Sequence, residues 1–346
     1  MSSLATGLGA LRRFPRGPAT ALTMYALMLI LPNILSGSIS NQNYLDIFQE
    51  FANIAPLALA VGLTMILAEF DISVVSTYAL GGVLAIKLGD SEGILVGVLA
   101  AGAAGIAAGL IQGAIVARLN ISSVPVTLAG FLVIWGLSNI IAGGEQVPST
   151  NYAPGEKLVS VVLSIFTFAS LLVIGVTILI HLLLALTRLG RDLRAVGGDR
   201  RASAISGIRV PWVVVGTFAA AGLIAALGGA LQALSFSNAN PTVSFSPLVV
   251  AVIAAIIGGV GISGAKGSAL GIACGVVTLA LLHEILIVIE IDPDLASVIT
   301  GGILMLIAIL SAPDLRVSRS LSSRLSRRLG RRTGRSAPNP NPDPST

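Results

Sequence analysis

The sequence has few charged residues, few aromatic residues and almost no cysteine or histidine. Charged residues make up 11% and aromatic residues 5% of its 346 residues, whereas 54% are hydrophobic, and the mean hydropathy is +0.92. Soluble domains carry about 25% charged residues, so this composition excludes an ordinary soluble protein. The single cysteine, Cys274, excludes a disulfide framework, and two histidines, His181 and His283, leave little for a zinc or haem site. We therefore expect no metal and no other cofactor.

Long apolar runs fill most of the chain instead. Each is close to the roughly 20 residues that a helix needs to cross the ~30 Å hydrocarbon core of a bilayer. The connections between the runs are short, so they leave no room for a separate catalytic domain. We predict an all-α polytopic membrane protein with about ten transmembrane helices. The predicted spans are residues 20–36, 53–69, 74–89, 93–117, 125–142, 159–186, 211–235, 247–262, 268–289 and 295–311.

Positive charge orients these predicted spans. With the N-terminus inside, every Lys and Arg residue except Lys87 and Lys157 falls in an inner loop or in a tail. Cytoplasmic loops carry an excess of Lys and Arg, so we expect both termini to be cytoplasmic. The predicted organisation is a cytoplasmic N-terminal tail at 1–19, a transmembrane domain at 20–311 and a basic, partly disordered cytoplasmic tail at 312–346.

The C-terminal tail allows two interpretations. Leu321, Leu325 and Leu329 recur every four residues among arginines, which is typical of a basic amphipathic helix on anionic lipid. A solvated basic tail that only enforces orientation fits the same residues. Membrane lipid is the expected partner of this basic segment, and nucleic acid is not.

Two short motifs resemble enzyme signatures, but each lacks the neighbouring structure or the further residue that the signature requires. Gly259, Gly261 and Gly264 match GxGxxG, but a dinucleotide site needs a strand, a turn and a helix in a water-facing unit. Here, apolar runs of membrane length lie on both sides. His283 begins an HExxH pattern, but Ile287 occupies the position of the second histidine. The sequence therefore predicts no enzyme.

Glycines spaced by four predict close helix packing, because a glycine face lets a neighbouring backbone approach. The two sets are Gly105, Gly109 and Gly113, and Gly267, Gly271 and Gly275.

Glu284 is an ionisable residue inside a predicted span. Such a group costs about 3 kcal/mol at the centre of a bilayer by insertion scales, and it usually faces a cavity or another polar group. Two interpretations stay open: Glu284 lines a pathway or forms an interhelical hydrogen bond, or it lies shallow near the outer surface.

The coupling loop, as we call residues 187–210, is the one long and strongly charged connection. Asp199 is suited to cap a short helix, Ala202, Ala204 and Ile205 fill two turns, and Gly207 is suited to end it in a left-handed conformation. This helix lies outside the membrane with small and apolar side chains. Nothing in a single chain covers them, so we expect a cytoplasmic partner.

Three separated blocks resemble one family. Residues 187–208, TRLGRDLRAVGGDRRASAISGI, resemble the pattern TRFGRxxYAIGGNxxAAxxSGI. Residues 256–275 resemble GGxSLxGGxGSxxGTxxG, and residues 61–80 resemble GxTxVLxxGGIDLSVGSxxAL. The chain is thus similar, over about residues 45–311, to permease subunits of ribose-type (simple sugar) ATP-binding-cassette (ABC) importers in the branched-chain amino-acid/monosaccharide permease superfamily.

The resemblance implies a multi-pass permease of the bacterial cytoplasmic (inner) membrane that carries no nucleotide site of its own. Its partners would be ABC ATPase subunits, a second permease copy or paralogue and an extracytoplasmic sugar-binding protein. ATP would be hydrolysed in the ATPase subunits. The helix from Asp199 to Ser206 would be the coupling helix that docks in an ATPase groove. Asp71 and Ser73 match the family pattern and, with Glu284, are the expected pathway or gating residues.

One departure from the family pattern stands out. Ala68-Glu69-Phe70 replaces Gly-Gly-Ile, and Val75 replaces a glycine, which puts a close backbone approach at this turn in question. The alternative substrates are branched-chain amino acids or nucleosides. An ion-coupled carrier would need paired ionisable groups near the midplane, and an intramembrane enzyme would need a catalytic set that the sequence lacks.

Overall fold

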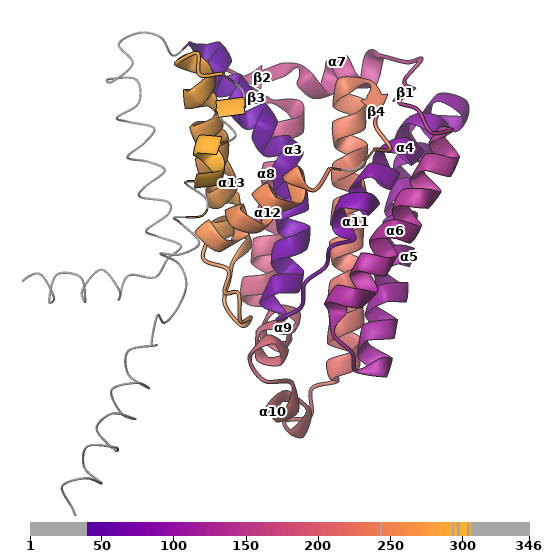
Figure 1. The fold of residues 1–346 in the computed structure, drawn as a ribbon, viewed down its shortest axis with the longest axis vertical. Helices are drawn as coiled ribbons and strands as arrows, with labels where there is room; N and C mark the ends of the chain where they lie inside the picture. The colour runs from indigo at the N-terminus through magenta and orange to yellow at the C-terminus, as the bar shows by residue number, and fades with distance from the viewer. Residues whose placement is uncertain (1–39, 243, 293, 296–297, 303–304, 306–346) are drawn as a thin grey trace, which may run out of the picture. The chain divides into compact units, whose positions relative to one another are not determined.

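The computed structural model describes residues 40–242, 244–292, 294–295, 298–302 and 305, and these residues are mostly helical (Figure 1). The helices are α3 (Asn41–Ile66), α4 (Val74–Glu92), α5 (Ile94–Leu119), α6 (Ser123–Ala142), α7 (Ala153–Val159), α8 (Phe168–Leu186), α9 (Arg188–Gly198), α10 (Arg200–Ile205), α11 (Val210–Phe236), α12 (Ser246–Ile257) and α13 (Ala269–Val288). Short antiparallel strands pair β1 (Val147–Pro148) with β4 (Asn238–Ala239), and β2 (Val161–Leu163) with β3 (Phe166–Thr167). The predicted first span at 20–36, most of the last span at 295–311 and both tails lie outside the described residues.

Six of the described helices are long and apolar enough to cross a membrane: α3, α5, α6, α8, α11 and α13. Helix α4 has 19 residues but carries Lys87, Asp90 and Glu92 in its last turns. Helix α12 has 12 residues, which gives a length of about 18 Å at 1.5 Å per residue and falls short of the hydrocarbon core. The fold is therefore that of a multi-pass membrane protein, and the count of ten spans stays a prediction.

Three predicted boundaries differ from the structure by five residues or more. Helix α3 begins at Asn41 rather than at residue 53. Its first turns consist largely of polar residues, so a prediction based on apolar runs places the start of the helix too late. Helix α8 begins at Phe168 rather than at 159, because the preceding residues form the β2–β3 hairpin. Helix α12 ends at Ile257 rather than at 262, and the chain then turns through Gly259 at a φ of +90°.

Helix α3 occupies the core of the described bundle. It packs against α8, α11, α12 and α13, and it is buried on most faces from Phe51 to Leu67. This environment explains why the sequence of α3 shows no polar stripe beyond its first turns. A helix that is apolar all round is one that is surrounded by protein or by lipid.

Glycine contacts hold α5 against α11, as predicted. A Cβ atom on Gly105 would lie 2.3 Å from the carbonyl oxygen of Gly222, and one on Gly109 would lie 2.1 Å from that of Phe218. Gly275 likewise leaves room for the carbonyl oxygen of Ala254 in α12. These pairs of helices can approach closely only because the contact positions lack side chains.

The two ends of the bundle differ in their connections. Helix α7 and both strand pairs lie at one end, and α9 and α10 lie at the other (Figure 1). The end with α9 and α10 carries most of the described arginines, so the excess of positive charge predicts that it faces the cytoplasm. We refer to it as the basic end.

Candidate functional site

A polar cavity of about 1270 Å³ lies among α3, α4, α11, α12 and α13. Its polar lining consists of amides, hydroxyls, one carboxylate and one imidazole. These residues are Glu50, Asn53, Tyr78, Gln146, Gln232, Asn238, Asn240, Thr242, Ser244, Ser246, His283 and Thr300. Among the described lining residues, none is Lys or Arg. Such a lining can donate and accept hydrogen bonds with a neutral polar ligand, but it offers no Lys or Arg side chain to pair with an anionic one.

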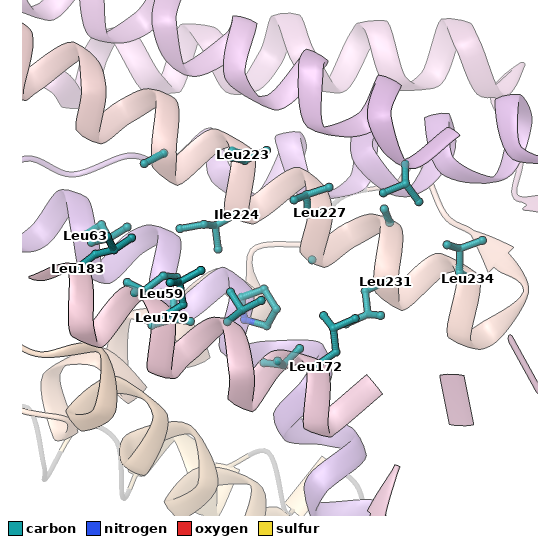
Figure 2. Close-up of a pocket in the computed structure, with 18 of the residues that line it drawn as sticks. Leu59, Leu63, Leu172, Leu179, Leu183, Leu223, Ile224, Leu227, Leu231 and Leu234 are labelled. Carbon is teal, nitrogen blue, oxygen red and sulfur yellow. The ribbon is translucent and has the colours of Figure 1, made fainter. Parts of the chain in front are cut away.

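A second cavity, of about 990 Å³, is a groove between α3, α8 and α11. Figure 2 shows that leucines dominate its walls. The labelled lining residues are Leu59, Leu63, Leu172, Leu179, Leu183, Leu223, Ile224, Leu227, Leu231 and Leu234. Because these side chains have no hydrogen-bonding groups, the groove suits hydrocarbon and is a poor route for a polar solute.

Asp71 and Ser73 form a buried turn directly before α4. The Asp71 carboxylate accepts hydrogen bonds from the Ser73 amide (2.9 Å) and the Ser73 hydroxyl (2.7 Å). Gln112 of α5 donates to the Ser73 hydroxyl oxygen at 2.8 Å. Neither Asp71 nor Ser73 lines the polar cavity, but Val75 and Tyr78, which follow on α4, do. The turn therefore fixes the start of a helix that forms part of the cavity wall.

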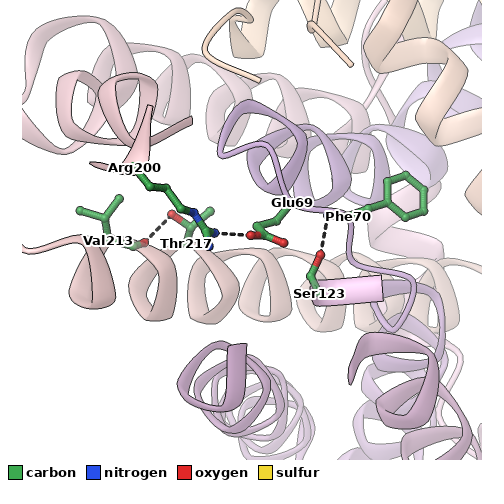
Figure 3. A network of polar contacts seen from close by, with 6 residues as sticks. All are labelled: Glu69, Phe70, Ser123, Arg200, Val213 and Thr217. Carbon is green, nitrogen blue, oxygen red and sulfur yellow. Dashed lines mark hydrogen bonds and ion pairs between the residues drawn. The ribbon is translucent and has the colours of Figure 1, made fainter. Parts of the chain in front are cut away.

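The same connection, residues 67–73, is attached to α6. The Phe70 amide donates to the Ser123 hydroxyl at 3.0 Å (Figure 3), and the Ile72 amide donates to the Thr127 hydroxyl at 3.2 Å. These bonds pair backbone N–H groups that lie between two helices and therefore have no intrahelical acceptor. Non-helical backbone at membrane depth is tolerated where protein buries it in this way.

Glu284 forms a hydrogen bond between two helices. Its carboxylate accepts from the Asn43 side-chain amide at 2.7 Å, and 9% of the residue is exposed. Asn43 lies in the first turn of α3 and Glu284 lies in the last turns of α13. Glu284 is not among the residues that line the polar cavity.

The predicted short helix in the coupling loop is present as α10. The Asp199 carboxylate caps it by accepting hydrogen bonds from the amides of Arg201 (2.8 Å) and Ala202 (2.9 Å). Ala202, Ala204 and Ile205 are exposed, and Ile205 is 82% exposed. Gly207 follows with a φ of +86°, the left-handed conformation that favours glycine at this position. Small and apolar side chains thus project from the basic end without a cover within the described residues.

Helix α9 packs closely against the ends of α3 and α8 and is hydrogen-bonded to α8. A Cβ atom on Gly197 would lie 2.0 Å from the Ile66 carbonyl oxygen at the end of α3. The same oxygen accepts a hydrogen bond from the Ala265 amide at 2.9 Å. Arg194 donates to the Leu184 carbonyl at 2.8 Å. The segment with the GxGxxG pattern therefore contributes to this junction, and α12 rather than a strand precedes it.

The departure at Ala68-Glu69-Phe70 has two consequences in the structure. Ala68 adopts a φ of +63°, and the close approach survives because the facing residue, Gly264, has no side chain. Glu69 forms an ion pair with Arg200 of α10 (Figure 3). The sequence analysis missed this pair, although a carboxylate in place of a glycine, opposite an arginine-rich loop, was a signal for it.

Gln112 was also missed. It is a polar residue within an otherwise apolar run, it is 5% exposed, and intramembrane polar residues are usually functional or bound to a partner. The presence of a glutamine within this apolar run was therefore a signal, readable from the sequence, that its side chain has a polar partner.

Comparisons with known proteins agree with the resemblance. Residues 43–308 match the family described as branched-chain amino acid transport system / permease component. The chain is 27% identical to the ribose import permease protein RbsC of Escherichia coli (strain K12), covering 84% of this chain and 91% of that protein. It is 28% identical to the fructose import permease protein FruF of Bifidobacterium longum (strain NCC 2705), covering 74% of each chain.

A third relative is the L-arabinose transport system permease protein AraH of Escherichia coli (strain K12), at 27% identity over 76% of this chain and 83% of that protein. No solved structure matches the chain. The family match covers most of the sequence and includes the polar cavity, the buried turn at Asp71 and Ser73, and α10. The chain therefore belongs to the family of branched-chain amino acid transport system permease components.

Proposed function

We propose that this chain is the membrane subunit of an ABC importer for a monosaccharide in the bacterial cytoplasmic membrane. The names of the relatives support a sugar, because they include permease proteins for ribose, fructose and L-arabinose. The partners would be ABC ATPase subunits, a second permease copy or paralogue and an extracytoplasmic sugar-binding protein.

The observation that carries the choice of substrate is the polar cavity. Its described lining offers neutral amides and hydroxyls with Glu50 as the one carboxylate, and no Lys or Arg. The hydroxyl groups of a sugar can exchange their hydrogen bonds with water for bonds to these groups. An amino acid carries a carboxylate, which loses its hydration on entry and needs a cationic partner or several donors in return. The cavity therefore favours a neutral sugar over a branched-chain amino acid.

The transport mechanism requires two packed states of the helices. No bond is made or broken in this subunit. ATP binding and hydrolysis in the partner subunits would shift α10, and the membrane helices would follow into the alternative packing. Contacts with the sugar along the path need only be weak, because the binding protein supplies recognition and a tight central site would retain the cargo.

The substrate assignment is tested by uptake of radiolabelled monosaccharides and of leucine into cells that carry the complete transport system. We expect uptake of at least one neutral monosaccharide and none of leucine. Gln232→Leu removes an amide from the cavity wall, so it should slow sugar uptake roughly 5- to 10-fold, as expected for the loss of about 1 kcal/mol of hydrogen bonding. Leu227→Ala, in the apolar groove on the same helix, is the control and should leave uptake near normal. Uptake of leucine instead of a sugar would overturn the assignment.

A further inference from the structure

We propose that Glu69 is a positioning residue for α10, and that its ion pair with Arg200 transmits movement of α10 to the wall of the polar cavity. This inference rests on the proposed function, because it assumes that a partner moves α10. It adds to that function a specific link within this chain, at a position where the family pattern has glycine.

The ion pair between Glu69 and Arg200 is partly buried and therefore differs from a solvent-exposed surface pair. The Glu69 side chain is 10% exposed and the Arg200 side chain is 33% exposed. A carboxylate that is largely removed from water is stable only when a partner compensates its charge. Within the part of the chain that the structure describes, Arg200–Glu69 is the one salt bridge, so α10 supplies that compensation.

Other attachments of α10 to the membrane helices are few. It packs against α9 and the start of α11, and Ala202, Ala204 and Ile205 are exposed. A Cβ atom on Gly207 would meet no atom within 4 Å. A short helix held mainly at its two ends can rotate unless a side chain fixes it. The Arg200–Glu69 pair fixes it to the connection between α3 and α4.

From Glu69, the contacts lead to the cavity through consecutive residues. Phe70 is bonded to Ser123 of α6, and Asp71 is bonded to Ser73 at the start of α4. Tyr78 follows one turn later, where it lines the cavity and donates a hydrogen bond to the Asn53 carbonyl at 2.8 Å. A displacement of α10 that moves Glu69 would therefore act on the beginning of α4.

The first experiment measures the position of α10 in the purified full-length chain in lipid nanodiscs. Spin labels at Leu119→Cys and Ile205→Cys, both at exposed positions, in a Cys274→Ala background, report the distance between α5 and α10 by pulsed electron paramagnetic resonance. We expect Glu69→Gln to broaden or shift the distance distribution. The charge-reversed double variant, Glu69→Arg with Arg200→Glu, should restore it. An unchanged distribution in Glu69→Gln, in a protein that elutes as a single folded species, would overturn the proposal.

The second experiment measures uptake and the stimulation of ATP hydrolysis by loaded binding protein in the complete transporter. Glu69→Arg should lower both roughly 2- to 30-fold, the range of coupling changes of this kind, while the ATPase subunits still co-purify. The charge-reversed double variant should recover at least part of this loss, which a merely structural defect would not allow. Arg118→Glu, at an exposed arginine in the last turn of α5 and outside the coupling loop, is the control for a charge change and should leave uptake and stimulation near normal.

The two proposals fail in different ways. Normal uptake and normal stimulation in Glu69→Arg would overturn the role of the ion pair and leave the importer intact. If the ATPase subunits do not bind this chain at all, the proposed function fails, whereas the distance measurement still reports whether Glu69 positions α10.

Discussion

Two adjacent glycines at the end of α9 differ strongly in how much space the surrounding structure leaves for a side chain. A Cβ atom on Gly197 would lie 2.0 Å from the Ile66 carbonyl oxygen, whereas one on Gly198 would lie 3.5 Å from the Ala265 side chain, an ordinary contact. The first glycine is needed for close packing, and the second is not. Ala68 is the opposite case, because a residue with a side chain occupies a left-handed conformation that costs about 1–2 kcal/mol for most residues.

We predict that Gly197→Ala lowers the free energy of unfolding by about 1–3 kcal/mol, as overpacking of a well-packed contact does. Gly198→Ala is the matched control and should be neutral or stabilising by up to about 1 kcal/mol, because alanine favours the helix. Unfolding by detergent titration, followed by circular dichroism, measures both. Equal stability of the two variants would contradict the tight contact between α9 and α3.

At the scale of elements, α10 has the features of a docking helix. Asp199 caps it, Gly207 ends it, and its exposed side chains are small or apolar. Its neighbour α9 packs closely against α3 through Gly197, which faces the Ile66 carbonyl oxygen, and the Ala265 amide of the 258–268 connection donates a hydrogen bond to the same oxygen. A partner that engages α10 therefore acts on helices inside the bundle and not on a loose loop.

We predict that Ala204→Arg abolishes the proposed sugar uptake with little effect on folding, because Ala204 is exposed in the free chain and, under the proposed function, would face the groove of the ATPase subunit. Gly207→Val should act similarly, since a β-branched residue resists a positive φ. Co-purification of the ATPase subunits and uptake in cells are the two measurements. Ala153→Arg, at an exposed position of α7 at the opposite end, is the control for adding an arginine. Retention of the ATPase subunits and of normal uptake in Ala204→Arg would exclude α10 as the docking element.

At the scale of the whole molecule, the distribution of charge predicts the orientation in the membrane. The basic end contains α9 and α10, and the opposite end contains Asn240 beside the strand pair β1–β4. Ser149 and Ser203 would be natural labelling positions from sequence alone, but they are 4% and 5% exposed and would label slowly on either side. Asn240 and Ser206 are exposed and serve better.

We predict that a cysteine at Asn240, in a Cys274→Ala background, reacts with a membrane-impermeant maleimide in intact cells. A cysteine at Ser206 should react only after the inner face is made accessible, because the excess of Lys and Arg predicts that this end faces the cytoplasm. Labelling of Ser206→Cys from outside would reverse the predicted orientation.

The sequence by itself determined the class of the protein, the helices with long apolar runs and the local form of α10. Composition and run length depend on which residues are present, and capping by Asp199 and termination at Gly207 depend on neighbours in the chain, so no tertiary structure is needed for either. The glycine spacing also predicted that one face of α5 packs closely against a neighbouring helix, because spacing of four defines one helix face, whereas the identity of that neighbour, α11, came from the structure.

Only the tertiary structure decided which distant residues meet. Gln112 contacts Ser73, Asn43 contacts Glu284, and Arg200 contacts Glu69, and these pairs are separated by 39, 241 and 131 positions in the sequence. The shortness of α12 was also decided there, because hydropathy alone does not distinguish an apolar helix from an apolar turn that neighbouring helices bury. The polar cavity follows from the same packing, since its lining comes from five helices, the connections between them, and Thr300 and Gly301 after α13.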